Sequence, residues 1–295
     1  AGMPNWSEIL DIVDNSTNTA NVLKEMRIKY MRDITSITKR NVIAYYSGWM
    51  KKPDAPHVSI DEQDKNAFMS SVYKLDRKKG LDLILHTPGG DIAATESIVE
   101  YLKDMFDGNI RAFIPQLSMS AGTMMAMACK EIIMGKESSL GPIDPQMGGI
   151  ACQTVKEEFE RAVKDIKEHP SSLGLWQVIF SKYNPTFLLE CENAVKWSEQ
   201  LAKKWLKDAN PKINVDNIIK VFLNHKDAFS HNRHFSFSDC KNAGLNVKAL
   251  EDDQKLQEAV LSLHHCYMIL LDKFLISKVV ENQEGRAFVQ TFNMR

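Results

Sequence analysis

The stretch from residue 117 to residue 146, LSMSAGTMMAMACKEIIMGKESSLGPIDPQ, decides the fold and raises the question of function. Ser118 and Ser120 stand one residue apart, and Ala121 and Gly122 follow the second serine. The apolar run that comes next is typical of a helix, and EIIMG after it is typical of a short buried strand. The small residues fit two interpretations equally well on spacing alone. They form either a tightly packed core turn or a turn that presents a nucleophile beside an oxyanion hole.

The same alternation of strand and helix extends toward the N-terminus. Segments 41–50, 81–86 and 110–115 are predicted strands, and the segments between them have helical spacing. LDLILH is apolar almost throughout, as expected of a strand that is covered on both faces. Strands that alternate with helices predict a parallel sheet with right-handed crossovers. Beyond residue 153 the pattern is mostly helical, apart from a helix that ends at Gly244 and leads into an edge strand.

The composition is that of an ordinary globular protein. Of the 295 residues, 44% are hydrophobic and 25% are charged, and the net charge of -1 gives no reason to expect nucleic acid or an anionic membrane as a partner. The five cysteines are dispersed, which is typical of reduced thiols in the cytoplasm. Neither a signal peptide nor an apolar run of membrane-spanning length is evident. We therefore expect a cytoplasmic protein without a metal or a cofactor.

Two glycine-containing segments follow predicted strands, at the sheet edge where ligands bind in open α/β folds. In HTPGGD, paired glycines let backbone N–H groups face a ligand. In SMSAG, Ser120 would begin a helix, where unpaired N–H groups favour negative charge. One N–H from Gly90 and one from Ala121 would make a two-donor oxyanion hole.

Three neighbouring residues are candidates for contact with a substrate. Gly89 and Met119 adjoin the two proposed donors, and His86 ends the strand before the glycines. For His86, a strand-end histidine that is bonded to backbone groups is the simpler interpretation.

TPGG, SMSAG and SSLGPIDPQMGG, in this order and spacing, resemble the core of the Clp protease proteolytic subunit and of signal peptide peptidase A. The sequence is more similar to the serine dehydrogenase proteinase family, a distant relative of both, and the resemblance continues through SHNRHFS and LEDDQKLQEAVLSLHH. It implies an α/β fold with a ClpP/crotonase-like ββα spiral core, a largely parallel sheet and extra C-terminal helices. The implied organisation is a helical segment over 1–40, a catalytic domain over 41–250 with a helical insertion at about 153–226, and a C-terminal helix over 251–295.

The resemblance also implies a serine peptidase with Ser120 as its nucleophile. Where Clp-type peptidases carry the base histidine, this chain has DPQMGG, which offers Asp144. Where they carry the aspartate, it has SHNRH, which offers His231 and His234. The two roles would therefore exchange places, and a triad tolerates this because geometry and not chain order defines it. His231 is the preferred base and His234 the alternative, while Asp144, in a segment that also fits a β-turn, would orient the imidazole.

Other interpretations stay open from the sequence. A lysine base, as in signal peptide peptidase A, would come from Lys156 or Lys164, although both stand in a charged helical segment typical of exposed surface. A crotonase-like acyl-CoA enzyme and a non-catalytic oligomeric scaffold would share the fold. The resemblance implies a peptide or protein substrate and a homo-oligomer. The chain has no ATPase motif, so an unfoldase or activator would be a separate protein.

Overall fold

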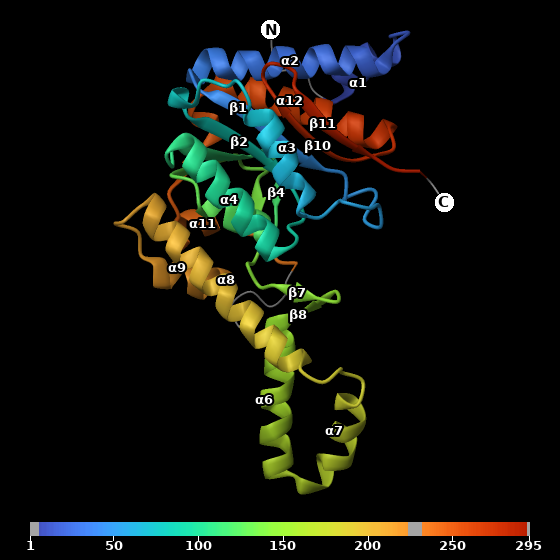
Figure 1. The fold of residues 1–295 in the computed structure, drawn as a ribbon, viewed down its shortest axis with the longest axis vertical. Coiled ribbons are helices and arrows are strands. Elements are labelled where there is room, and N and C mark those ends of the chain that lie inside the picture. The colour runs from blue at the N-terminus through green and yellow to red at the C-terminus, as the bar shows by residue number, and fades with distance from the viewer. Residues whose placement is uncertain (1–5, 224–231, 294–295) are drawn as a thin grey trace.

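The computed structural model describes residues 6–223 and 232–293, and a seven-stranded sheet forms its centre (Figure 1). The strands lie in the order β11-β10-β1-β2-β3-β5-β9. Their bounds are β1 (Asn41–Ser47), β2 (Leu81–His86), β3 (Ile110–Ile114), β5 (Glu131–Met134), β9 (Val247–Ala249), β10 (Ile276–Asn282) and β11 (Ala287–Thr291).

The sheet is largely parallel, as the sequence predicts. β1, β2, β3, β5 and β9 all run in the same direction, and only β10 and β11 are antiparallel to their neighbours. Every residue of β1 and β2 is buried, which explains why LDLILH lacks the alternation of a half-exposed strand. The α/β fold class and the edge strand after Gly244 are confirmed.

Helices cover both faces of this sheet. Val42, Ala44 and Tyr46 of β1 pack toward one face, and Ile43 and Tyr45 pack toward the other, as the period of two requires. The first face carries α1 (Trp6–Asp14), α2 (Thr19–Thr38) and α12 (Gln254–Lys273). The second face carries α3 (Gln63–Val72), α4 (Ile92–Phe106), α5 (Ala121–Met127), the end of α8 (Phe187–Ala209), α9 (Val215–Leu223) and α11 (Phe237–Ala243).

Beyond the carboxyl ends of the parallel strands, the chain forms a second and smaller set of pairings. β4 (Leu117–Ser118) pairs with Thr87 on one side and with β6 (Ser139–Leu140) on the other. Ile60 pairs with Gly90, and Phe235 pairs with Leu140. Segments that leave different strands of the large sheet therefore lie side by side here.

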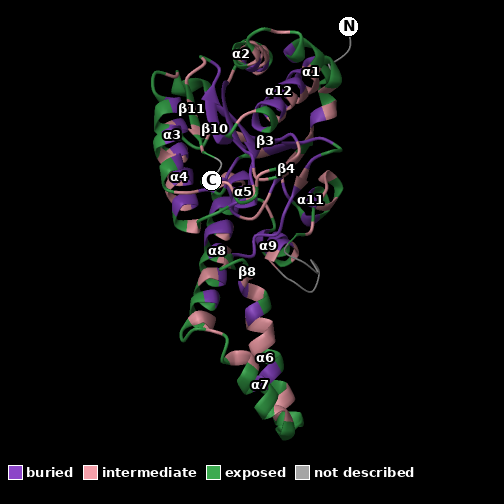
Figure 2. Ribbon diagram, turned by 90° about the vertical axis from the view of Figure 1, so that its right-hand side faces the viewer, coloured by how far each residue is buried: buried purple, intermediate pink, exposed green. Residues whose placement is uncertain are grey.

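An arm extends away from the sheet (Figure 1). It consists of α6 (Cys152–Glu168), α7 (Leu173–Phe180) and the first part of α8, and the hairpin of β7 (Gln146–Met147) and β8 (Ile150–Ala151) lies at its base. Figure 2 shows that most of this arm is exposed or half-buried. Its exposed side chains include the apolar residues Val163, Leu175 and Val178. Single-turn helices at Arg77–Lys79, Pro170–Ser172 and Leu250–Asp252 complete the fold. Within the described ranges, no helix combines the length and the apolar character that a membrane span needs.

The C-terminal stretch differs from the expected helix over 251–295. α12 ends at Lys273, and the chain then forms the antiparallel strands β10 and β11 at one edge of the sheet. The sequence of β10, ISKVVEN, does not read as a buried strand because Lys278 and Glu281 interrupt it. Both of these charges are nevertheless buried, each in an ion pair with a helix.

We predict that Asp82→Ala lowers the free energy of unfolding by about 3–5 kcal/mol, measured by urea denaturation. Asp82 is fully buried at the start of β2 and accepts hydrogen bonds from Arg40 Nε (2.7 Å) and from Arg111 Nε and Nη2 (both 2.8 Å). Its removal takes the buried carboxylate from two partly buried guanidinium groups, of which only Arg111 keeps a longer contact with an acid, Glu131 (3.9 Å). The control is Asp33→Ala, which breaks an exposed pair with Lys29 and should cost about 0.5 kcal/mol or less. Equal losses in the two variants would contradict the prediction.

Candidate active site

Ser120 adopts a backbone conformation that side chains normally avoid. It is the N-cap residue of α5 with φ 54° and ψ -118°, and one residue separates it from the end of β4. A non-glycine residue in this region is strained, and such strain persists where the surrounding structure enforces it. A sharp strand-to-helix turn of this kind presents a side-chain oxygen at the edge of a sheet, as in the nucleophile elbow of hydrolases. Ser120 itself is half-buried.

Glycines surround this turn because no side chain fits against it. A Cβ on Gly89 (φ +93°) would lie 2.7 Å from Met119 O, 2.8 Å from Ser120 Cβ and 2.9 Å from Ala121 N. A Cβ on Gly122 would lie 2.5 Å from the Ser118 hydroxyl oxygen and 2.5 Å from Thr87 Cγ2. The small residues thus serve tight packing, and the same packing holds Ser120 in its unusual conformation. The two interpretations of SMSAG are therefore compatible.

Two backbone N–H groups near Ser120 donate to none of the described residues. Ile60 N–H donates to Gly89 O (2.8 Å) and Asp91 N–H donates to Ile60 O (3.0 Å). In a parallel pairing of this register, the N–H of the intervening Gly90 points away from Ile60, toward the side on which β4 and Ser120 lie. Within the described residues, neither Gly90 N–H nor Ala121 N–H donates a hydrogen bond. An oxyanion hole requires two backbone donors that are not already bonded within the protein.

Asp144 is a buried carboxylate on the loop between β6 and β7. It is 1% exposed, and its Oδ1 accepts a hydrogen bond from Gln153 N–H (3.2 Å) in the first turn of α6. β6, which leads to Asp144, lies beside β4, which leads to Ser120. The fold therefore brings the segments that carry these two residues next to each other.

The two candidate histidines stand in the segment that follows α9. His231, the preferred base, lies outside the described residues. His234 is exposed and immediately precedes Phe235. Phe235 is buried and exchanges two backbone hydrogen bonds with Leu140 of β6 (2.7 and 3.0 Å). The segments that carry Ser120, Asp144 and His234 thus pair in one small sheet, in the order β4, β6, Phe235.

Met119 and the two candidate lysines lie on different parts of the fold. Met119 lies over Gly141, where its sulfur is 2.6 Å from the position of a Cβ. Lys156 is half-buried on α6, and Lys164 is exposed on the same helix and pairs with Glu168 (4.0 Å). Both candidate lysine bases therefore lie on α6, in the arm.

His86 faces the opposite side of the sheet. Its ring packs against Trp49 (4.5 Å between ring centroids), Tyr46 (5.3 Å) and His264 of α12 (5.4 Å). It is fully buried, and neither ring nitrogen has a hydrogen-bond partner among the described residues, so the backbone bond that the simpler interpretation expects is not present there. Burial lowers the pKa of His86 to about 3. A role in contacting substrate beside Ser120 stays a prediction, and this orientation does not support it.

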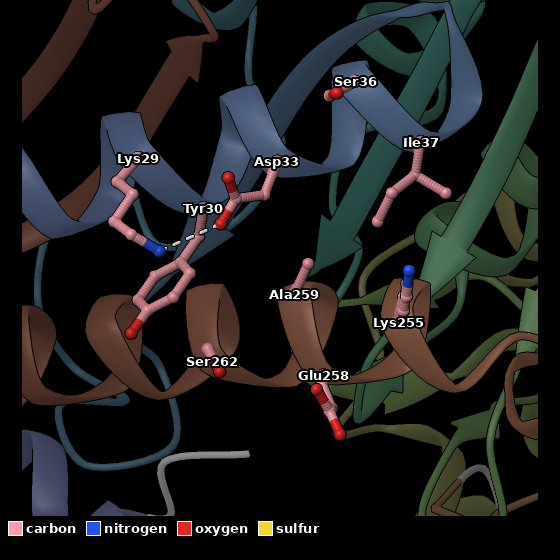
Figure 3. Close-up of a pocket in the computed structure, with 9 residues that line it drawn as sticks. All are labelled: Lys29, Tyr30, Asp33, Ser36, Ile37, Lys255, Glu258, Ala259 and Ser262. Carbon is pink, nitrogen blue, oxygen red and sulfur yellow. Dashed lines mark hydrogen bonds and ion pairs between the residues drawn. The ribbon is translucent and has the colours of Figure 1, made fainter. Parts of the chain in front are cut away.

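A groove between α2 and α12, with a volume of about 380 Å³, contains none of the candidate residues (Figure 3). Figure 3 shows its polar lining, including the pair formed by Lys29 and Asp33. It lies on the face of the sheet away from α5. Within the described ranges, His, Cys, Asp and Glu side chains do not gather in a group of three that could hold a metal ion.

Ile60 is the residue of this site that the sequence does not reveal. Its backbone fixes the path of Gly89 and Gly90, and a Cβ on Gly90 would lie 2.3 Å from Ile60 N. The contribution comes from main-chain atoms alone, so no residue type signals it. The nearest indication is the short apolar pattern HVSI ahead of α3.

Comparisons with known proteins agree with this architecture. The model of the ClpP-like SDH-type serine proteinases matches residues 10–267 of the chain. An uncharacterized protein of Methanocaldococcus jannaschii is 24% identical over 250 residues, which cover 83% of this chain and 79% of that protein. A second uncharacterized protein of the same organism is 28% identical over 188 residues, which cover 64% of this chain and 59% of that protein.

We predict that Ser120→Gly is more stable than Ser120→Ala by about 1 kcal/mol in urea denaturation, because glycine adopts a positive φ without strain. The control is the same pair of substitutions at Ser70, an exposed position in α3. There glycine should be the less stable variant, by about 1 kcal/mol. The same sign at both positions would refute a strained backbone at Ser120.

We predict that the free energy of unfolding falls between pH 7.5 and pH 5.0, and that His86 contributes about 2 kcal/mol of this loss. The unfolded histidine binds a proton near its ordinary pKa of 6.5, whereas burial lowers the pKa of folded His86 to about 3. The unfolded state therefore binds more protons over this range and is favoured as the pH falls. His86→Phe should flatten the dependence by that amount, measured by urea denaturation at each pH. An equal slope in His86→Phe and in the wild type would contradict the prediction.

Proposed function

The chain belongs to the family of ClpP-like SDH-type serine proteinases, and on that premise we propose that it hydrolyses peptide bonds with Ser120 as the nucleophile. The observation that carries the proposal is the strained turn at Ser120, held against Gly89 beside two N–H groups that donate to none of the described residues. A core turn that served packing alone would have no need for a strained serine, since glycine would fit it better.

In the proposed reaction, the imidazole of His231 accepts the hydroxyl proton as Ser120 Oγ attacks the carbonyl carbon of the peptide. The oxygen of that carbonyl becomes negatively charged and accepts hydrogen bonds from Gly90 N–H and Ala121 N–H. The imidazolium then gives its proton to the leaving amine as the C–N bond breaks, which leaves an ester on Ser120. The same histidine takes a proton from water as the water oxygen attacks the ester carbon. The imidazolium then returns this proton to Ser120 Oγ as the C–O bond breaks and the acid is released.

Asp144 is the proposed partner of the imidazole. A carboxylate in that role accepts the second ring N–H, fixes the tautomer and stabilises the imidazolium. Its burial and its place after β6, between the strand of Ser120 and Phe235, support the assignment. His234 is the alternative base because it directly precedes Phe235.

The class of substrate follows from the family, and we propose a peptide or a protein. Assembly with further copies of this chain, and a separate protein that unfolds substrates or activates the site, stay predictions from the resemblance.

We predict that an alkyl fluorophosphonate labels the intact protein on Ser120, identified by peptide mass spectrometry. The probe reacts with a serine whose hydroxyl is activated by a base. Ser120→Ala should abolish labelling and lower turnover by a factor of about 10⁶, and His231→Ala should abolish labelling as well. Ser118→Ala is the matched control, because Ser118 is a fully buried hydroxyl two residues away and its loss should leave labelling intact.

Other outcomes would change the assignment in defined ways. Labelling that survives His231→Ala but not His234→Ala would make His234 the base, and dependence on Lys156 would indicate a Ser–Lys dyad. Absence of labelling in a folded protein would refute the peptidase. Retention on immobilised CoA would then indicate an acyl-CoA enzyme, and its absence would indicate a scaffold.

A further inference from the structure

A buried ion pair lies next to Ile60, the residue whose main chain bonds to the glycine strand (Gly89–Asp91). Lys278 of β10 is 1% exposed, and its Nζ donates to Asp64 Oδ1 (2.8 Å), Asp64 Oδ2 (2.9 Å) and Ser59 O (2.7 Å). Asp64 of α3 is also 1% exposed, and its Oδ2 accepts from Tyr45 Oη (2.5 Å) and from Asp61 N–H (3.1 Å). The pair therefore binds the backbone on both sides of Ile60.

Ile60 passes this restraint to the candidate oxyanion hole. Its N–H and its carbonyl oxygen both bond to the Gly89–Asp91 segment, while Ser59 and Asp61 on either side of it bond to the ion pair. The position of the Ile60 main chain sets the position of Gly90, because the two main chains are in direct contact. A shift of Ile60 would move Gly90 N–H relative to Ser120.

Burial of two charges is not explained by stability alone. Apolar side chains of similar volume commonly stabilise a core as well as a buried ion pair does. An ammonium group, however, has three donors and can bond to a carboxylate and a backbone carbonyl at once, which an apolar side chain cannot do. The contacts of Lys278 use this capacity to hold Ser59 and Asp64 at fixed places.

We propose that Lys278 and Asp64 form a positioning pair that, through Ile60, fixes Gly90 N–H for the oxyanion. The proposal rests on the peptidase function proposed above. Lys278 lies beyond residue 267, where the match to the family model ends. Neither residue touches the reacting atoms, so their effect is on geometry.

The test compares Lys278→Met with Arg27→Met. Arg27 of α2 forms a second buried ion pair with Glu281 (2.8 Å), three residues after Lys278 on β10 and directed to the other face of the sheet. Both variants lose a buried charge pair of the same strand, but only Lys278 contacts the segment next to Gly90. Asp64→Asn serves as a milder second variant if Lys278→Met does not fold.

The first measurement is the rate at which the fluorophosphonate labels Ser120, with the final stoichiometry as a count of folded sites. Lys278→Met should lower the rate constant about 10²-fold, the effect of a displaced oxyanion donor, and Asp64→Asn about 10-fold. Stoichiometry and the pH midpoint of labelling should not change, because the base is untouched. Arg27→Met should keep the wild-type rate constant within about twofold. A purely structural role for Lys278 would lower the stoichiometry and leave the rate constant unchanged.

The second measurement is amide hydrogen exchange at Ile60 and Asp91, which does not depend on activity. Exchange should be at least about 10-fold faster in Lys278→Met than in Arg27→Met, because a loosened Ile60 opens both hydrogen bonds to the glycine strand. Equal exchange and equal labelling rates in the two variants would overturn the positioning pair. If the probe does not label the wild type but exchange is still faster in Lys278→Met, the peptidase function is refuted. The conclusion that Lys278 restrains the glycine strand would then still hold.

Discussion

The contact between the main chain of Gly89 and the turn at Ser120 is the constraint on which the rest of this site depends. A single Cβ at position 89 would come within 3 Å of three atoms of that turn. Because the two segments touch without side chains between them, the N–H groups of Gly90 and Ala121 lie close to the same serine. The pairing of Thr87 with Ser118 and of Ile60 with Gly90 keeps both segments in register.

The buried hydroxyl of Thr123 connects the turn at Ser120 to Gly141, which follows β6. Thr123 Oγ1 lies within hydrogen-bonding distance of Ser118 O (3.0 Å) and Gly141 O (2.9 Å), and it accepts from Gly141 N–H (3.1 Å). One side chain of α5 thereby links β4 to the end of β6, three residues before Asp144. Contacts on both sides therefore keep Ser120 in its strained conformation. Ile60 and the glycines act on one side, and Thr123 acts on the other.

The large sheet was predictable because its central strands have local sequence patterns that are typical of buried strands. Segments 41–50, 81–86 and 110–115 are mostly apolar runs between helical patterns, and each one contains a strand, β1, β2 and β3. β10 was not predictable, since Lys278 and Glu281 look like surface residues until their partners are known. Those partners, Asp64 and Arg27, are 214 and 254 residues away in the chain. No local pattern carries that information.

The residues of the site likewise fall into those that a local motif reveals and those that only the fold shows. Gly89 and Gly90 are identified because no other residue type fits their close main-chain contacts, and Ser120 is identified by the small residues around its hydroxyl. Both signals are visible in a short motif. Ile60 acts through its main chain, which any residue supplies, and Lys278 acts through Ile60. The parts of the site that a motif reveals are thus those where the backbone or the chemistry requires a particular residue type. The parts that hold the strained residues in place come from distant segments, and only the fold shows them.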